Sequence, residues 1–334
     1  MLALILTSIS SEQSGGILTQ QNILIEILKN NGFKVEIYVL NDGKNSFIDF
    51  YLPTKPKGLN FAKDYDIVIL NDPHIGRLTW YTILNKKFKI ILFSHGWIFH
   101  DSRSFSRKLI FRILSKVSLS SIDRIFCVSP QDLIAIDGND MPNASLLWNP
   151  VKRIYDGPLE SLTFNGEFVY IGPNNKNKNL KKLILLFNQD TMQTFRLNII
   201  GRGTKELNPI TKNIRIFGEI SDLEIDEILK KSSYYISLSK YEGFGISIVE
   251  AMSYGLTPIL SDNIAHKYHI TTSKCGLLLS NDIKEANSQI IDFCSIEKTK
   301  LNKSLMDYSK CFTTDVFTKK LKSELNNRNG SREI

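Results

Sequence analysis

Two glutamates flank a glycine-rich corner in the stretch SKYEGFGISIVEAMSYG, residues 239–255. They are Glu242 and Glu250, and seven residues separate them. The corner directly after the first glutamate consists of Gly243, Phe244 and Gly245. Glycine lets the backbone turn sharply and lets a ligand approach closely. A helix beginning at Ile246 would offer unpaired N–H groups and about half a positive charge to an anion. The spacing therefore predicts a nucleotide diphosphate on this helix, with Glu250 near its ribose and Glu242 at the other end of the ligand.

These residues need a strand before the corner and a helix after it, and the whole chain repeats that alternation. Short apolar runs occur in the first half as LALILT, KVEIYV, DIVIL, KIILF, RIFCV and SLLW, and in the second half as EFVYI, RLNII, IRIF, YYISL, TPIL and GLLL. Amphipathic segments of helix length, such as ILTQQNILIEILKN and NLKKLILLF, lie between most of them. Continuous apolar strands separated by helices are typical of parallel sheets buried on both faces. We therefore predict an α/β fold with two doubly wound, Rossmann-like domains and with ligands at the carboxyl ends of the strands.

The boundary between the two domains is expected in WNPVKRIYDGP, residues 148–158, which is the least structured junction. A chain of 334 residues is long enough for two ordinary domains. We expect a first domain over residues 1–150 and a second over residues 151–334. The last helix could return to the first domain.

The charge balance favours an acidic partner. Lys and Arg number 42 against 34 Asp and Glu, which gives a formal net charge of +8 and a pI near 9.1. Phosphate-bearing ligands, anionic lipid and nucleic acid are the classes that this charge admits. The apolar start MLALILTSIS lacks a basic segment and a cleavage site, so we interpret it as a buried strand and not as a signal peptide. The four cysteines form no CxxC pair, which argues against a zinc site or a disulfide framework.

The glycine corner belongs to an ordered set of motifs along the chain. EGFG followed by EAMSYG resembles the Glu-x7-Glu signature of glycosyltransferase family 4, retaining enzymes of the GT-B fold. The other matching stretches are SGG at residues 14–16, FSHGW, VSP, WNP, YIGPNNKNKNL, NIIGRG, FGEI and KCGLLL, and together they cover most of the chain. The sequence departs from the family at Pro173, where an arginine usually helps a lysine to hold the diphosphate. Lys178 would then act with less help, from Lys176 or Arg202.

The resemblance implies transfer of a sugar from a UDP- or GDP-linked donor to an acceptor hydroxyl, with retention of anomeric configuration and without a metal ion or other cofactor. A lysine and a helix N-terminus would stabilise the leaving diphosphate. The resemblance assigns the acceptor to residues 1–150 and the nucleotide sugar to residues 151–334. The residues it implies are His95 and Glu242 at the reacting sugar, Gly16 and Lys178 at the diphosphate, Glu250 at the ribose, and Arg202, Gly243, Phe244, Gly245 and Ile246 in the rest of the donor site.

Each of these residues also has a purely structural interpretation. The glutamates could be solvated residues near a helix start, His95 an exposed residue at a strand end, and the lysines of KNKNLKK a solvated helix face. Gly15 and Gly16 could simply form a strand-to-helix turn. His266 and His269 lack a third candidate ligand nearby, and we interpret them as ordinary residues. The Asp-x-Asp pattern at Asp64 and Asp66 precedes its strand, and we attribute it to chance.

The segment Arg103–Val117, RSFSRKLIFRILSKV, predicts a basic amphipathic helix. It holds five basic residues and no acidic one, with apolar positions repeating every four residues. Such a helix can lie on an anionic membrane surface, or it can pack on the sheet with its basic edge in solvent. The first option would suit a cytoplasmic enzyme, peripheral at the inner face of the cytoplasmic membrane, that acts on a lipid-linked oligosaccharide in the synthesis of O-antigen, capsule or lipopolysaccharide.

Other function classes remain open at this stage. A GT-B epimerase acting on a UDP-sugar is the nearest alternative, and a non-catalytic GT-B protein that binds sugar or partners a transferase is another. A nucleic-acid binder is not favoured, because basic and aromatic residues do not interleave. The base, the sugar, the acceptor, the linkage and the oligomeric state leave no signal in the sequence.

Overall fold

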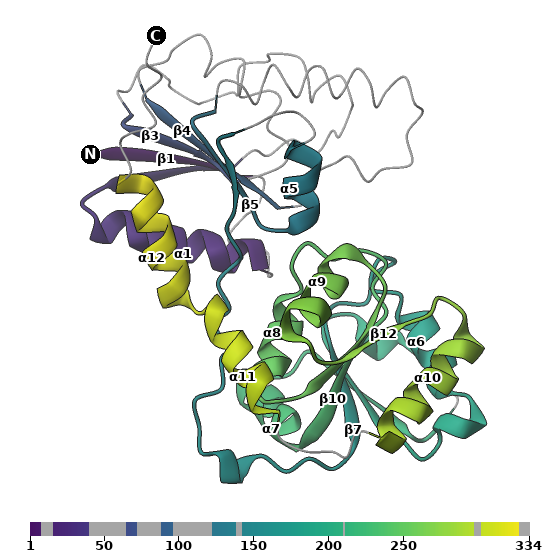
Figure 1. The fold of residues 1–334 in the computed structure, drawn as a ribbon. Helices are drawn as coiled ribbons and strands as arrows, with labels where there is room; N and C mark the ends of the chain where they lie inside the picture. The colour runs from purple at the N-terminus through teal and green to yellow at the C-terminus, as the bar shows by residue number, and fades with distance from the viewer. Residues whose placement is uncertain are drawn as a thin grey trace, which may run out of the picture. The chain divides into compact units, whose positions relative to one another are not determined.

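The computed structural model describes residues 1–7, 16–39, 65–71, 88–95, 122–137, 142–209, 211–296 and 302–326. The chain divides into two compact units, one formed by Met1–Pro150 together with Phe317–Ile334 and the other by Val151–Val316 (Figure 1). Each unit is built around one parallel sheet.

The first unit contains a sheet whose described strands number six and run in the order β2-β1-β3-β4-β5-β6, all parallel. The strands are β1 (Leu2–Thr7), β2 (Lys34–Val39), β3 (Ile67–Leu70), β4 (Lys89–Ser94), β5 (Arg124–Cys127) and β6 (Ala144–Leu146). Alternate side chains of a strand point to opposite faces, so a strand buried on both faces must be apolar throughout. In β1, Ala3 and Ile5 face one layer of helices, whereas Leu4 and Leu6 face the opposite layer.

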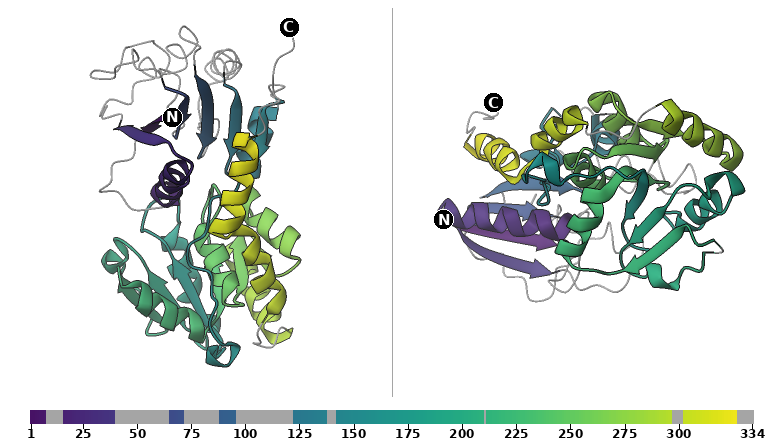
Figure 2. Two further views of the ribbon diagram at one scale, coloured as in Figure 1. Left: turned by 90° about the vertical axis from the view of Figure 1, so that its left-hand side faces the viewer. Right: turned by 90° about the horizontal axis from the view of Figure 1, so that it is seen from below.

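Helices cover both faces of this first sheet. Helices α1 (Gly16–Asn30) and α12 (Thr314–Asn326) lie side by side on one face, as Figures 1 and 2 show. Phe317 and Leu321 of α12 pack there with Leu24 and Leu28 of α1. Helix α5 (Pro130–Asp137) covers the other face through Ile136.

The second unit contains a parallel sheet in the order β12-β11-β10-β7-β8-β9. Its strands are β7 (Glu167–Ile171), β8 (Leu197–Ile200), β9 (Ile214–Gly218), β10 (Ser232–Ser237), β11 (Thr257–Ser261) and β12 (Leu277–Leu279). Strand order therefore reverses between β7 and β10, which is the doubly wound arrangement of dinucleotide-binding folds. In such sheets ligands bind beyond the carboxyl ends of the strands at the reversal point.

Two layers of helices enclose the second sheet (Figure 1). The helices are α6 (Leu180–Phe187), α7 (Asp222–Lys231), α8 (Ile246–Ser253), α9 (Ile264–Ser273), α10 (Ile283–Ile296) and α11 (Lys303–Ser309). Buried residues of α6 and α10 pack against one face of the sheet, and those of α7, α8 and α11 against the other. The prediction of two doubly wound parallel sheets is confirmed.

The starts of α7 and α8 differ in a way that bears on function. Helix α7 begins with a capping box, in which the Ser221 hydroxyl accepts from the Glu224 N–H and the Glu224 carboxylate accepts from the Ser221 N–H at 2.8 Å. Helix α8 instead has Gly245 at its N-cap position, with φ +85°, and no side chain of the described residues caps it. Its first N–H groups therefore remain available for an anion.

Candidate active site

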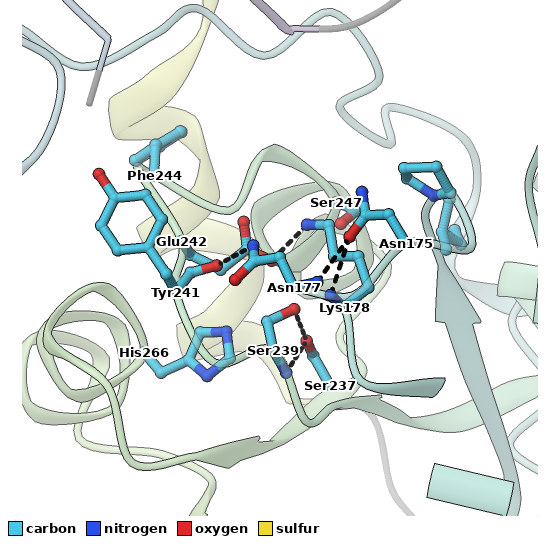
Figure 3. Close-up of polar contacts among 12 residues, drawn as sticks. Asn175, Asn177, Lys178, Ser237, Ser239, Tyr241, Glu242, Phe244, Ser247 and His266 are labelled. Atoms are coloured by element: carbon cyan, nitrogen blue, oxygen red, sulfur yellow. Dashed lines mark hydrogen bonds and ion pairs between the residues drawn. The ribbon is translucent and has the colours of Figure 1, made fainter. Parts of the chain in front are cut away.

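The loops after β7 and β10 meet at the reversal point of the second sheet. The backbone N–H of Lys240 donates to the carbonyl of Asn177 at 2.9 Å, and the Asn177 side chain donates to the carbonyl of Tyr241 at 2.7 Å (Figure 3). The Asn175 side chain in turn accepts from the N–H groups of Asn177 and Lys178, both at 3.0 Å. The donor loop predicted from YIGPNNKNKNL is thus held against the glycine corner.

An ion pair joins these two loops. Lys178 Nζ lies 2.5 Å from Glu242 Oε1, and Figure 3 shows the two side chains pointing toward each other. Both side chains are largely buried, with 18% and 13% of their surface exposed. The sequence assigned Lys178 and Glu242 to the same ligand but did not predict that they contact each other. Their pairing places a cation and a carboxylate beside the uncapped start of α8.

The glycine corner turns the chain from β10 into α8. Gly243 lies in open space, and an added Cβ there would meet no atom within 4 Å. Phe244 is buried, and its carbonyl lies 2.7 Å from His269 Nε2. Because a carbonyl can only accept, His269 Nε2 carries the proton and fixes the corner from behind. These contacts confine the backbone turn that the glycines make possible.

The first residues of α8 differ in burial. Ile246, Val249 and Met252 are three residues apart on α8, and the last two are fully buried. Ile246, the first residue of the helix, is only half-buried. Ile248 takes its place in the core. The start of the helix is therefore more accessible than its middle.

Glu250 lies on α8 one turn after its start and is largely buried. Arg153 Nη1 is 3.4 Å from Glu250 Oε2, and the same guanidinium pairs with Asp222. Burial raises the pKa of Glu250 to about 7, although the charge of Arg153 lowers it. Arg153 was missed in the sequence because it lies in the junction WNPVKRIYDGP, where no periodic pattern exists. Only its basic charge within that junction could have drawn attention to it.

The expected helpers of Lys178 are Lys176, which follows β7, and Arg202, which follows β8. The side chains of Lys176 and Arg202 are exposed, and Lys178 is paired with Glu242. The carbonyl of Arg202 accepts from the backbone N–H of Asn174 at 2.8 Å, so this residue supports the donor loop through its backbone. Pro173 lies at the beginning of that loop, and the carbonyl of Pro173 accepts from the Tyr170 hydroxyl at 3.4 Å.

Two glycines also shape the floor of the donor loop. An ideal Cβ on Gly201, whose φ is +138°, would come within 2.1 Å of the carbonyl oxygen of Gly172. The ends of β7 and β8 can therefore approach each other only without a side chain at Gly201. The motif NIIGRG thus has a steric reason for its first glycine.

The first unit holds the remaining predicted site residues. His95 directly follows β4, and its Nε2 lies 2.8 Å from Asn71 Oδ1. Burial lowers the pKa of His95 to about 3, so its ring is neutral at pH 7. Gly16 is the first residue of α1. The predicted basic helix Arg103–Val117 lies outside the described residues.

Two motifs set aside in the sequence have structural roles. Asp66 lies at the amino end of β3 and accepts from the backbone N–H of Leu2 at 2.6 Å. His266 is fully buried on α9, with Nδ1 2.8 Å from the carbonyl of Ser261, and burial lowers its pKa to about 4. Among the described residues, no group of three or more His, Cys, Asp or Glu side chains could hold a metal ion. None of the helices in the described ranges is long and apolar enough to span a bilayer.

Comparison with known proteins shows what the second unit is similar to. Residues 163–310, which include the donor loop, the glycine corner and α8, match the family model described as glycosyl transferases group 1. The match covers most of the second unit and confirms the resemblance found in the sequence motifs.

Two relatives carry the name GDP-mannose:cellobiosyl-diphosphopolyprenol alpha-mannosyltransferase. The protein of Xanthomonas oryzae pv. oryzae (strain PXO99A) is 25% identical over 259 residues, which are 70% of this chain and 66% of that protein. The protein of Komagataeibacter xylinus is 26% identical over 245 residues, 69% of this chain and 62% of that protein. The matched part thus spans slightly less than two thirds of the length of these relatives.

The fold is shared with a solved glycosyltransferase. The apo form of the lipopolysaccharide outer core galactosyltransferase WaaB superposes with a TM-score of 0.71 at 18% sequence identity, covering 97% of this chain and 99% of that one. Two doubly wound units in one chain, together with this likeness, define the GT-B fold.

Proposed function

We propose that the protein is a glycosyltransferase that moves a sugar from a nucleotide-sugar donor to an acceptor hydroxyl. The observation that carries this proposal is the placement of Lys178 and Glu242 beside the uncapped start of α8, with Glu250 one turn further along that helix. A cation and a helix N-terminus can stabilise the charge that develops on a leaving diphosphate. The two relatives described above are named as transferases that use GDP-mannose, and not as epimerases.

The residues then take distinct roles. Lys178 exchanges the carboxylate of Glu242 for the diphosphate, and Glu242 turns to the hydroxyls of the donor sugar. Glu250 holds the ribose, with Arg153 as the counter-charge that favours its ionised form. Gly16 of the first unit contributes to the diphosphate contact. Gly243, Phe244, Gly245 and Ile246 supply the backbone of the donor site.

The finer chemistry follows from the same residues. Because Lys178 and α8 supply positive charge at the diphosphate, transfer needs no metal ion. We infer that the anomeric configuration is retained, as the resemblance to family 4 implies. The acceptor is a lipid-linked sugar in the synthesis of a surface polysaccharide, since the two relatives are named for a diphosphopolyprenol-linked acceptor. Such an acceptor suits an enzyme at the inner face of the cytoplasmic membrane.

Thermal unfolding in the presence of nucleotides tests the donor assignment. The panel contains GDP, UDP, GDP-mannose, UDP-glucose and UDP-N-acetylglucosamine, with AMP as the control. A ligand at 100 times its dissociation constant adds about 2.7 kcal/mol to the free energy of unfolding. We expect stabilisation by one nucleoside diphosphate and by its sugar, and a weaker effect in Glu250→Ala. Unfolding temperatures that are the same with all five compounds as with AMP would contradict the proposal.

A further inference from the structure

Hydrogen bonds connect the side chains of Gln21, Asn71 and His95 in the first unit. Asn71 follows β3 and His95 follows β4, and these neighbouring parallel strands end at the same edge of the sheet. His95 Nε2 lies 2.8 Å from Asn71 Oδ1. Asn71 Nδ2 donates to Gln21 Oε1 of α1 at 3.1 Å, and its backbone N–H donates to the carbonyl of Leu6 at 2.8 Å. Asn71 is completely buried and Gln21 nearly so, which holds the chain in place.

This arrangement determines which ring nitrogen of His95 carries the proton. The amide nitrogen of Asn71 donates to Gln21 Oε1, so the atom of Asn71 that faces the imidazole is the amide oxygen. An amide oxygen only accepts, and Nε2 of His95 must therefore donate. In a neutral ring the other nitrogen, Nδ1, then bears a lone pair.

The lone pair of Nδ1 is not used within the described part of the chain. Nδ1 of His95 is shielded from solvent and has no hydrogen-bond partner among the described residues. A buried polar atom without a partner is uncommon and costs free energy. A donor on a bound ligand, such as a hydroxyl group, would satisfy it.

We propose that Asn71, held by Gln21, is a positioning residue that fixes His95 as the Nε2–H tautomer, so that Nδ1 accepts a hydrogen bond from a hydroxyl of the sugar substrate. The nature of the ligand rests on the proposed function, whereas the tautomer follows from the first unit alone. His95 thereby recognises a hydroxyl and takes no proton from it, because desolvation keeps its pKa far below neutral pH.

Nitrogen NMR of the imidazole rings tests the tautomer in the full chain without any substrate. The protein has five histidines, and loss of one signal set in His95→Gln identifies His95. We expect the wild type to show a protonated Nε2 and an unprotonated Nδ1 from pH 5 to pH 8. A protonated Nδ1, or averaging of both tautomers, would overturn the inference.

Two variants at Asn71 separate positioning from mere structural support. In Asn71→Asp the carboxylate still accepts from Nε2–H, and its charge raises the pKa of His95 by about 1 to 3. We expect kcat/KM of this variant to be near the wild-type value at pH 8. It should fall below the raised pKa, because protonated His95 has no lone pair. In Asn71→Leu the acceptor is gone, and kcat/KM should fall about 10-fold at every pH.

Further variants guard against failure to fold and against a general charge effect. Gln21→Met releases the amide of Asn71, so both tautomers of His95 should appear. Asn31→Asp is the matched control, since Asn31 follows the far end of α1 and binds the carbonyl of Ile27. It should leave the His95 signals and kcat/KM unchanged. A pH-independent loss that is equal in Asn71→Asp and Asn71→Leu would contradict the inference.

The NMR result also separates this inference from the proposed function. A fixed Nε2–H tautomer in a protein that transfers no sugar would refute the sugar as the ligand and the proposed function with it. Transfer by a protein whose His95 carries its proton on Nδ1 would refute only the role of Asn71.

Discussion

Removal of Lys178 should destabilise the second unit, because it leaves the carboxylate of Glu242 buried without a counter-charge. The Lys178 and Glu242 side chains are 82% and 87% buried, since 18% and 13% of their surfaces are exposed. In Lys178→Met, Glu242 stays in this environment without its counter-charge. We therefore expect a large loss of stability from the single change and a recovery in Lys178→Met/Glu242→Gln.

The magnitude follows from the 2.5 Å separation of the two charged atoms. With an effective dielectric constant of about 20, the attraction amounts to about 7 kcal/mol. Desolvation costs several kcal/mol for each ion and offsets most of that gain. Breaking a fully buried pair costs about 3–5 kcal/mol. Because these side chains keep some exposure, we expect about 2–3 kcal/mol for Lys178→Met and a double variant within about 1 kcal/mol of the wild type.

Calorimetric unfolding of the four proteins in the double-mutant cycle measures this coupling. The transition of the second unit is identified by its shift with a bound nucleoside diphosphate. Lys310→Met is the control, since Lys310 pairs with Asp307 at 2.7 Å but both side chains are mostly exposed. An exposed pair contributes about 0–1 kcal/mol. A Lys178–Glu242 coupling energy no larger than the loss of stability in Lys310→Met would refute the pair as a buried element of the site.

Three further outcomes are expected. Burial raises the pKa of Glu250 to about 7, so the folded state binds the proton of this carboxyl more tightly than the unfolded state. The contribution of Glu250 protonation to stability is therefore complete below about pH 4.3 and is lost as the pH rises to about 7. Urea unfolding of the wild type and Glu250→Gln should thus diverge by up to about 4 kcal/mol across this window, and parallel pH curves would exclude the raised pKa. Sugar transfer should persist in excess EDTA, and activity that vanishes there and returns with manganese or magnesium would disprove metal independence. Replacing Lys108, Arg112 and Lys116 by glutamine should release the protein from phosphatidylglycerol vesicles in co-sedimentation, because each basic residue contributes about 1 kcal/mol of attraction, and equal pelleting of both proteins would rule out a membrane role.

Local periodicity was sufficient to predict the sheets and the corner. Strands such as IVIL in β3 are apolar on both faces, and that requirement is visible within four residues. The corner is equally local, because Gly245 adopts a φ of +85° that glycine tolerates best. Such features depend only on neighbours in the chain.

The side-chain pairs of the site could not be predicted in the same way. Lys178 and Glu242 are 64 residues apart, and Arg153 and Glu250 are 97 residues apart. Their contacts depend on strand order and on the path of two loops, neither of which a local pattern records. The Asn71 amide likewise becomes informative only when β3 and β4 are known to be neighbours.

Transfer of a labelled sugar to lipid is the most direct test of the central claim. The protein is incubated with labelled GDP-mannose or with each UDP-sugar and with a bacterial lipid extract that contains diphosphopolyprenol-linked sugars. One donor should deliver label to the lipid together with an equal amount of its nucleoside diphosphate. Glu242→Ala should reduce that rate by about 100-fold, the effect of losing one transition-state contact. Absence of transfer from every donor, or an undiminished rate in Glu242→Ala, would contradict the account.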